Sequence, residues 1–183
     1  KSGVDASKWQ ELRNGGAPLF LAGSTHAGED EIVLQAFKTV RKRLPKARLV
    51  IVPRHPERAL YVVAQALPYG KVDLFSDLSR DWDVAVVDKI GILFDLYAAA
   101  DAAFVGGSLV PKGGQNLMEP ALFGIQVTHG PYMDDFPDAG RMDAMKASSV
   151  VRDVPQLADA WLNALDASCG AAARQACAAY FKT

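Results

Sequence analysis

The chain is poor in cysteine, nearly neutral, and without a long apolar run, and each shortage excludes a class of protein. Its 183 residues include 2 cysteines, and the formal net charge is −1. Near-neutral charge argues against nucleic acid as the main partner, because neutralising phosphates requires a basic surface. No run of about 18 apolar residues and no secretory signal pattern occurs. With 50% hydrophobic and 22% charged residues, the composition is that of a globular domain with a sizeable core.

The two cysteines, Cys169 and Cys177, lie in an alanine-rich stretch of helical character. We interpret them as small apolar residues in a reducing compartment, not as a disulfide framework. No repeat or change of composition divides the chain, so we expect a single domain over residues 1–183. The sequence begins at Lys1 without methionine. We therefore expect it to be a piece of a longer protein.

Several nucleotide and metal motifs are also missing. No G-x-G-x-x-G follows the first predicted strand, which argues against a nicotinamide or flavin site, and no G-x-x-x-x-G-K-[ST] occurs. No cluster of His, Cys and carboxylate residues has metal-site spacing, so we expect no metal and no cofactor. A bound phosphate would instead be neutralised by helix N-termini and by cations such as Arg54 and Lys112.

Apolar segments of strand length alternate with segments of helical periodicity along the chain. The expected strands are 18–22, 49–52, 72–75, 84–87, 102–105, 125–127 and a short one near 150–151. The expected helices are 5–13, 29–43, 56–67, 92–100, 117–123, a weak one after 137, and a long tail from 155. This alternation predicts an α/β fold, a Rossmann-like parallel sheet with helices on both faces.

A glycine-rich stretch, residues 104–131, organises this pattern. Gly106-Gly107-Ser108 follows a short apolar strand, and Asn116 with Glu119 forms an N-x-x-E pattern at the start of the next helix. Unpaired amides beside a glycine turn are suited to a phosphate. The alternative is that Asn116 and Glu119 do no more than cap this helix.

Two further strand ends carry polar side chains. Two prolines flank Arg54 and His55 after the second strand and make a stiff loop at the edge where ligands bind in open α/β sheets. Arg54 is suited to a phosphate or base, although pairing with Glu57 is equally compatible with the sequence. His26, His55 and His129 each lie near a predicted strand end. A lone histidine is more often structural, but three that converge would make a polar cleft. In the first turn of the second predicted helix, Glu29, Asp30 and Glu31 are expected to complement the helix dipole.

Four segments together resemble one family in order and spacing. They are Ser24-Thr25-His26-x-Gly28-Glu29-x-Glu31, Val52-Pro53-Arg54-His55-Pro56-Glu57-Arg58, Phe104-Val105-Gly106-Gly107-Ser108-Leu109-Val110, and Gly113-Gly114-Gln115-Asn116-x-x-Glu119-Pro120-Ala121. They are similar to the C-terminal half of the 3-deoxy-D-manno-octulosonic acid (Kdo) transferases of lipopolysaccharide synthesis. The similarity covers residues 19–131 well and the tail loosely.

The resemblance implies a GT-B glycosyltransferase, in which two Rossmann-like domains face a cleft. This chain would be the C-terminal domain that binds the donor CMP-Kdo. The absent N-terminal domain would carry the lipid A precursor site, the contact with the membrane surface and the glutamate expected as general base, so no catalytic residue is assigned here. The reaction would be inverting and metal-independent, at the cytoplasmic face of the bacterial inner membrane. The alternatives are another GT-B enzyme that uses a UDP-sugar, either a glycosyltransferase or an epimerase, and a non-catalytic nucleotide-binding module.

The same resemblance assigns roles to individual positions. The positions implied to contact the nucleotide or to line its pocket are Pro53, Arg54, Ile90, Gly91, Ile92, Gly107, Ser108, Asn116, Leu117, Met118 and Glu119, with Ser24 and His26 as further candidates. Asn116 and the helix amides would lie near the phosphate, Glu119 near the ribose hydroxyls, and the backbone of residues 90–92 near the cytosine or ribose.

The chain departs from the family pattern at some positions. Relatives often carry an acidic residue at Ile92 and a histidine at Gln115. Asp134-Asp135 replaces a more usual Asn-Phe pair in the loop after Pro131, and residues 71–82 match no family motif.

Overall fold

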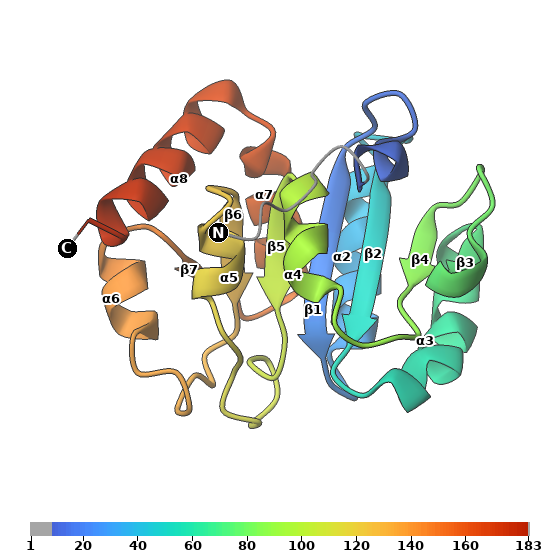
Figure 1. Ribbon diagram of the computed structural model, residues 1–183, viewed down its shortest axis with the longest axis horizontal. Coiled ribbons are helices and arrows are strands. Elements are labelled where there is room, and N and C mark those ends of the chain that lie inside the picture. The colour runs from blue at the N-terminus through green and yellow to red at the C-terminus, as the bar shows by residue number, and fades with distance from the viewer. Residues whose placement is uncertain (1–8, 183) are drawn as a thin grey trace.

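The computed structural model describes residues 9–182 and contains one seven-stranded parallel sheet (Figure 1). In chain order the strands are β1 (Leu19–Thr25), β2 (Arg48–Pro53), β3 (Val72–Leu74), β4 (Val84–Val86), β5 (Ala102–Val105), β6 (Gln126–His129) and β7 (Ser149–Val150). Their order across the sheet is β3-β4-β2-β1-β5-β6-β7, and each neighbouring pair is parallel. The predicted fold class is confirmed.

Helices cover both faces of the sheet, with α4 and α5 in front of it and α2 and α7 behind it in Figure 1. The α-helices are α2 (Asp30–Arg41), α3 (Ala59–Ala66), α4 (Leu93–Leu96), α5 (Met118–Ala121), α6 (Ala139–Ala144), α7 (Val154–Ala164) and α8 (Ala167–Tyr180). Short 3-10 turns are η1 (Glu11–Arg13), η2 (Pro56–Arg58), η3 (Leu67–Tyr69), η4 (Phe75–Asp77) and η5 (Tyr97–Ala99).

Alternating side chains of the central strands divide the core between the two faces. On β1, Phe20 and Ala22 pack with residues of α2 and α7, whereas Leu19 and Leu21 pack with Leu96 on the opposite face. All four β1 side chains are buried. Because successive strand residues point to opposite faces, a continuous apolar run is what a strand covered on both sides requires.

Two expected helices are divided in the structure. The predicted helix 92–100 is α4 followed by η5, and the predicted tail from 155 is α7 and α8. Asp166 separates the last two, because its side chain accepts hydrogen bonds from the amides of Ser168 and Cys169 and so begins a new helix. Of the predicted helix 5–13, residues 5–8 lie outside the described residues, and its end forms the short turn η1.

The central strands end at one edge, which we call the carboxyl edge, and their backbones approach closely there. A Cβ atom on Gly106 would lie 2.4 Å from the carbonyl oxygen of Ser24, and one on Gly130 would lie 2.1 Å from that of Ser108. Ser24 itself has a φ of 55° next to a bulge in β1. Only glycine fits at positions 106 and 130, so the loops after β1, β5 and β6 are held together.

Candidate functional site

Glu29 lies at the centre of the carboxyl edge, between the loops that follow β1 and β5. Its side chain is 0% exposed. One carboxylate oxygen accepts hydrogen bonds from the amides of Ser108 at 3.0 Å and Leu109 at 2.8 Å. The other accepts from the amides of Gly107 at 2.8 Å and His26 at 2.9 Å. The expectation that Glu29 serves the helix dipole is therefore incomplete, since its carboxylate joins two loops.

The predicted pocket residues Gly107 and Ser108 are part of this joint. Their amides donate to Glu29, and Ser108 is fully buried. The Ser108 hydroxyl donates to the carbonyl of Val105 at 2.5 Å and accepts from the amide of Gly130 at 2.8 Å. Its polar atoms are thus engaged within the protein, and the outer surface of this turn at Gly107 is itself buried.

His26 lies over that outer surface. A Cβ on Gly107 would lie 3.5 Å from His26 Nε2 and 3.6 Å from Gln115 Nε2. His26 Nε2 is buried and has no hydrogen-bond partner within residues 9–182. The pKa of His26 is lowered, mainly by burial of the ring. The negative charge of Glu29 raises this pKa, whereas the nearby His55, Lys112 and Arg58 lower it further. A neutral imidazole is therefore expected at neutral pH.

Two of the three histidines converge and the third does not. The rings of His26 and His55 are 5.8 Å apart, edge to face. His129, at the end of β6, is buried, with Nδ1 2.7 Å from the Gly130 carbonyl and Nε2 3.0 Å from Asp143 Oδ1. His129 is thus held inside the protein, and the idea of a cleft formed by all three histidines is wrong.

The loop after β2 carries two arginines, of which Arg58 is paired with a carboxylate and Arg54 is not, within the described residues. Arg58 donates to Asp30, which is 1% exposed and also accepts from Thr25 Oγ1 at 2.7 Å. Arg54 is exposed and has no carboxylate within 4.0 Å among the described residues, while Glu57 lies 4.0 Å from His55 Nδ1. The pairing of Arg54 with Glu57 does not form, so the Arg54 side chain is available to a ligand.

The segment 113–119 crosses the same edge after β5. Asn116 Oδ1 accepts from the amide of Met118 at 2.9 Å, and Asn116 Nδ2 lies 3.4 Å from Glu119 Oε1. The amides of Gln115, Asn116 and Leu117 have no acceptor in the part of the chain that the structure describes. Because α5 is a single turn, its dipole is small, and these amides matter more to an anion than the dipole does.

Glu119 is a partly buried carboxylate beside these amides. Burial raises its pKa, partly offset by the hydrogen bond from Asn116. Tyr97 lies close by, and its pKa is raised by its own burial and then by the charge of Glu119. A carboxylate that no cation neutralises is suited to accept hydrogen bonds from a ligand's hydroxyl groups.

The remaining predicted contacts lie in the loop after β4 and at the ends of β1 and β2. Ile90 is 82% exposed and Gly91 has a φ of 84° in the loop after β4. Ile92 is half-buried against the core below. In the loop after Pro131, the amide of Tyr132 donates to the carbonyl of Ser108, and that of Asp135 to the carbonyl of Gly113, both at 2.9 Å. Pro53, at the end of β2, is buried, and Ser24 is half-buried.

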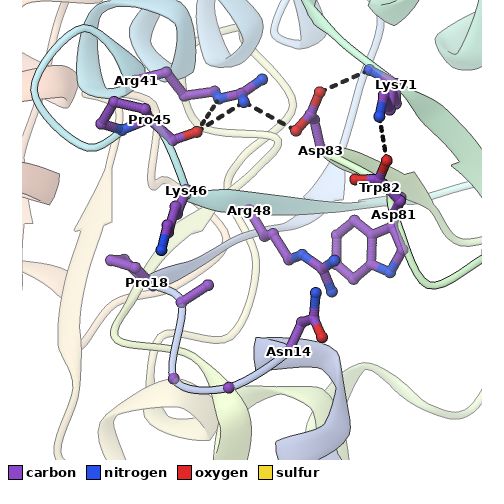
Figure 2. A pocket seen from close by; sticks show the side chains of 13 residues that line it. Asn14, Pro18, Arg41, Pro45, Lys46, Arg48, Lys71, Asp81, Trp82 and Asp83 are labelled. Carbon is purple, nitrogen blue, oxygen red and sulfur yellow. Dashed lines mark hydrogen bonds and ion pairs between the residues drawn. The ribbon is translucent and has the colours of Figure 1, made fainter.

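A cavity of about 580 Å³ lies at the opposite, amino edge of the sheet (Figure 2). Ion pairs cross it, from Arg41 to Asp83 at 2.9 Å and from Lys71 to Asp81. Residues of the segment 71–82, which matched no family motif, form one wall. None of the predicted site residues lines this cavity, so the candidate site is the open carboxyl edge.

The described part of the chain lacks two further features. Within residues 9–182, no group of three or more His, Cys, Asp or Glu side chains is placed to hold a metal ion. No helix in the same range is long and apolar enough to span a membrane.

The parallel sheet, its strand order and its covering helices match the fold of the C-terminal domain of GT-B glycosyltransferases. The crystal structure of WaaG, a glycosyltransferase involved in lipopolysaccharide biosynthesis, matches 98% of this chain with a TM-score of 0.64 and 16% identity, over 47% of its own length. The C-terminal CMP-Kdo binding domain of WaaA from Acinetobacter baumannii matches 97% of this chain, and 98% of itself, with a TM-score of 0.88 and 24% identity.

Sequence comparison identifies the family. No protein-family model matches the chain. A 3-deoxy-D-manno-octulosonic acid transferase of Aquifex aeolicus is 45% identical over 115 residues, 62% of this chain and 32% of that protein. One of Haemophilus influenzae is 37% identical over 164 residues, 87% of this chain and 37% of that protein. The chain thus belongs with the Kdo transferases, as predicted, and it spans only about a third of the length of these relatives.

Proposed function

We propose that this chain is the donor-binding domain of a Kdo transferase and that it binds CMP-Kdo at the carboxyl edge of its sheet. The observation that carries the proposal is a set of unsatisfied groups at that edge. Arg54 lacks a carboxylate partner, and the amides of residues 115–117 lack acceptors within the described range. Cations and free amides together are what a nucleotide phosphate requires.

The phosphate of CMP would lie between Arg54 and the amides of Gln115, Asn116 and Leu117. Lys112, which is exposed on the same glycine-rich segment, adds a second positive charge. These groups balance the phosphate charge without a metal ion, which is why we propose metal-independent chemistry. The Asn116 side chain is already used by Met118, so its part is to hold the segment in place.

The nucleoside would extend along α5 toward the loop after β4. Glu119 would accept hydrogen bonds from the ribose hydroxyls, and the backbone of residues 90–92 would contact the cytosine or ribose. Gly91, with its positive φ, allows that backbone to approach a ring closely. Pro53 fixes the direction of the loop that carries Arg54.

The complete enzyme would transfer Kdo to a hydroxyl group of a lipid A precursor with inversion at the anomeric carbon. The acceptor oxygen forms the new bond as CMP departs with the electron pair of the old one, and a general base takes the acceptor's proton. That base, the acceptor site and the contact with the cytoplasmic face of the inner membrane would belong to the N-terminal domain. This chain alone is therefore expected to bind CMP weakly and to show no transferase activity.

Calorimetric titration with CMP tests the binding proposal. We expect Arg54→Ala to weaken CMP binding about tenfold, because a charged hydrogen bond contributes about 1.5–3 kcal/mol, while the midpoint of denaturation stays unchanged. Lys46→Ala, an exposed cation at the amino edge, is the matched control and should not affect CMP binding. Tighter binding of UDP than of CMP would favour a UDP-sugar enzyme, and absence of binding to either would refute the proposal.

A further inference from the structure

The turn after β5 contains an anion-binding arrangement that is already filled. Three successive amides, those of Gly107, Ser108 and Leu109, point at the Glu29 carboxylate within 3.0 Å, and the His26 amide completes the set. Such concave groups of successive backbone amides, here called the amide nest, bind phosphates and other anions in many proteins. A glycine turn at the carboxyl edge is also where a ligand phosphate is normally received.

The four donors of the nest require an occupant that only accepts hydrogen bonds. All four contacts to Glu29 are N–H donors, and no acceptor is among them. An ionised carboxylate satisfies four donors, whereas a carboxamide of the same size would turn its own NH₂ group toward two of them. Because the side chain is 0% exposed, neither water nor a ligand anion shares the nest.

We propose that Glu29 is an internal anion that closes the amide nest to ligand phosphate and thereby directs the phosphate to the free amides of residues 115–117. This inference rests on the proposed nucleotide site, and it makes Glu29 a positioning residue. The two sets of amides belong to the same loop, and the bond from the Gly114 amide to the Gly107 carbonyl, 2.8 Å long, joins them. Fixing the nest therefore also fixes the segment that receives the phosphate.

The same carboxylate sets the position of His26. The backbone amide of His26 donates to Glu29, and the His26 ring then lies over Gly107 with Nε2 buried and unpartnered within the described residues. A ligand that approaches the turn from outside meets the partly exposed His26 ring and the Gln115 side chain, not the nest amides. Glu29 thus replaces a phosphate-binding turn by a surface that recognises uncharged polar groups, such as the hydroxyl groups of a sugar.

The first test is rescue of Glu29→Ala by a small carboxylate. The variant empties the nest, so we expect it to denature at a lower temperature than the wild type and to bind CMP about tenfold more weakly. Sodium formate should raise its denaturation temperature in a saturable manner and restore CMP binding, whereas sodium chloride at equal ionic strength should not. Glu29→Gln fills the same space with a carboxamide, and we expect it to be destabilised but not rescued.

Asp166→Ala is the control for a general effect of carboxylates. Asp166 also accepts from two backbone amides, but at an exposed helix start, so formate should not rescue its loss. Rescue that is equal in Glu29→Ala, Glu29→Gln and Asp166→Ala would overturn the proposal. So would an unrescued Glu29→Ala that binds CMP like the wild type.

A second measurement needs no variant. In a ¹⁵N-labelled wild-type protein, CMP should shift the amide resonances of residues 115–117 strongly, and those of Gly107, Ser108 and Leu109 should change little and exchange slowly with solvent. The largest shifts at the three nest amides would overturn the inference, because the phosphate would then occupy the nest. If the wild type binds no CMP while formate still rescues Glu29→Ala, the nucleotide proposal fails and the closed nest stands.

Discussion

The two edges of the sheet treat their charged side chains differently. At the amino edge, cations are paired with carboxylates of other elements: Arg13 with Asp101 at 3.0 Å and Arg41 with Asp83 at 2.9 Å. These pairs tie η1 and α2 to the strand starts, and the Asp101 carboxylate also accepts from the amide of Leu19. These paired charges at the amino edge hold separate elements of the chain together.

At the carboxyl edge, the buried carboxylate is met mainly by backbone amides and the exposed cations are left over. Glu29 is satisfied by four amides, so it needs no cation. Arg54 and Lys112 consequently have no carboxylate within 4.0 Å in the part of the chain described. The comparison shows how a nearly neutral protein can keep exposed cations at its ligand edge, because the buried Glu29 there is satisfied by backbone amides and not by a cation.

The largest effect should come from breaking the close backbone contact at the carboxyl edge. In Gly106→Ala the new Cβ would lie 2.4 Å from the Ser24 carbonyl oxygen and 2.7 Å from Thr25 Cα. Backbone atoms cannot give way cheaply, so we expect the free energy of unfolding to fall by about 3 kcal/mol or more. Urea denaturation followed by circular dichroism measures the change.

Gly140→Ala is its matched control. Gly140 lies in α6, and a Cβ there would meet nothing within 4 Å. Alanine favours a helix interior over glycine by about 0.5–1 kcal/mol, so this variant should be slightly stabilised. Equal effects of the two substitutions would show that the strand ends are not tightly packed.

The next effect compares one carboxylate from each edge. Asp30, at the carboxyl edge, is 1% exposed, accepts a hydrogen bond from Thr25 and pairs with Arg58. Asp83, at the amino edge, is more exposed to solvent and pairs with Arg41. Asp30→Asn leaves a largely buried guanidinium without its counter-charge, so a loss of about 3 kcal/mol is expected. Asp83→Asn should cost about 1 kcal/mol or less. Calorimetric unfolding of both variants in one buffer decides whether the edges differ as described.

Much of this architecture could be predicted from the sequence because the signals are local. Apolar strand segments, helical periodicity and glycines placed the sheet, its helices and the ligand edge. The division of the tail at Asp166 was missed, since alanine-rich sequence on both sides suits one continuous helix. The residues of the candidate site came from the family resemblance, and most of their proposed contacts remain predictions.

What could not be predicted depends on contacts far apart in the chain. Glu29 is 78 residues from Gly107 in sequence, and beside Asp30 and Glu31 it has the pattern of a helix start. No local pattern distinguishes a carboxylate that complements a dipole from one that crosses to another loop. The burial of His129 was missed for the same reason, because its partner Asp143 lies in α6, the helix that follows the loop after β6.

The smallest stability effect should come from Glu119→Gln, which separates ligand binding from folding. Burial raises the pKa of Glu119 in the folded protein, so folding takes up protons at this group. Its favourable contribution is therefore fully present below the unfolded-state pKa and is lost as the pH rises through the raised pKa. Glutamine does not titrate, so the variant should gain less than about 1 kcal/mol relative to the wild type near pH 7, and the gain should disappear near pH 4.

CMP binding should change in the opposite direction. If Glu119 accepts hydrogen bonds from the ribose hydroxyls, losing its charge should weaken CMP binding about tenfold at the pH where the variant is more stable. Denaturation curves at both pH values and calorimetric titration at neutral pH give the two quantities. Burying a carboxylate is unfavourable for stability. We expect the chain to keep one at such a position when the carboxylate contacts a ligand. Equal CMP affinity, with loss of stability at neutral pH, would instead show that Glu119 only caps its helix.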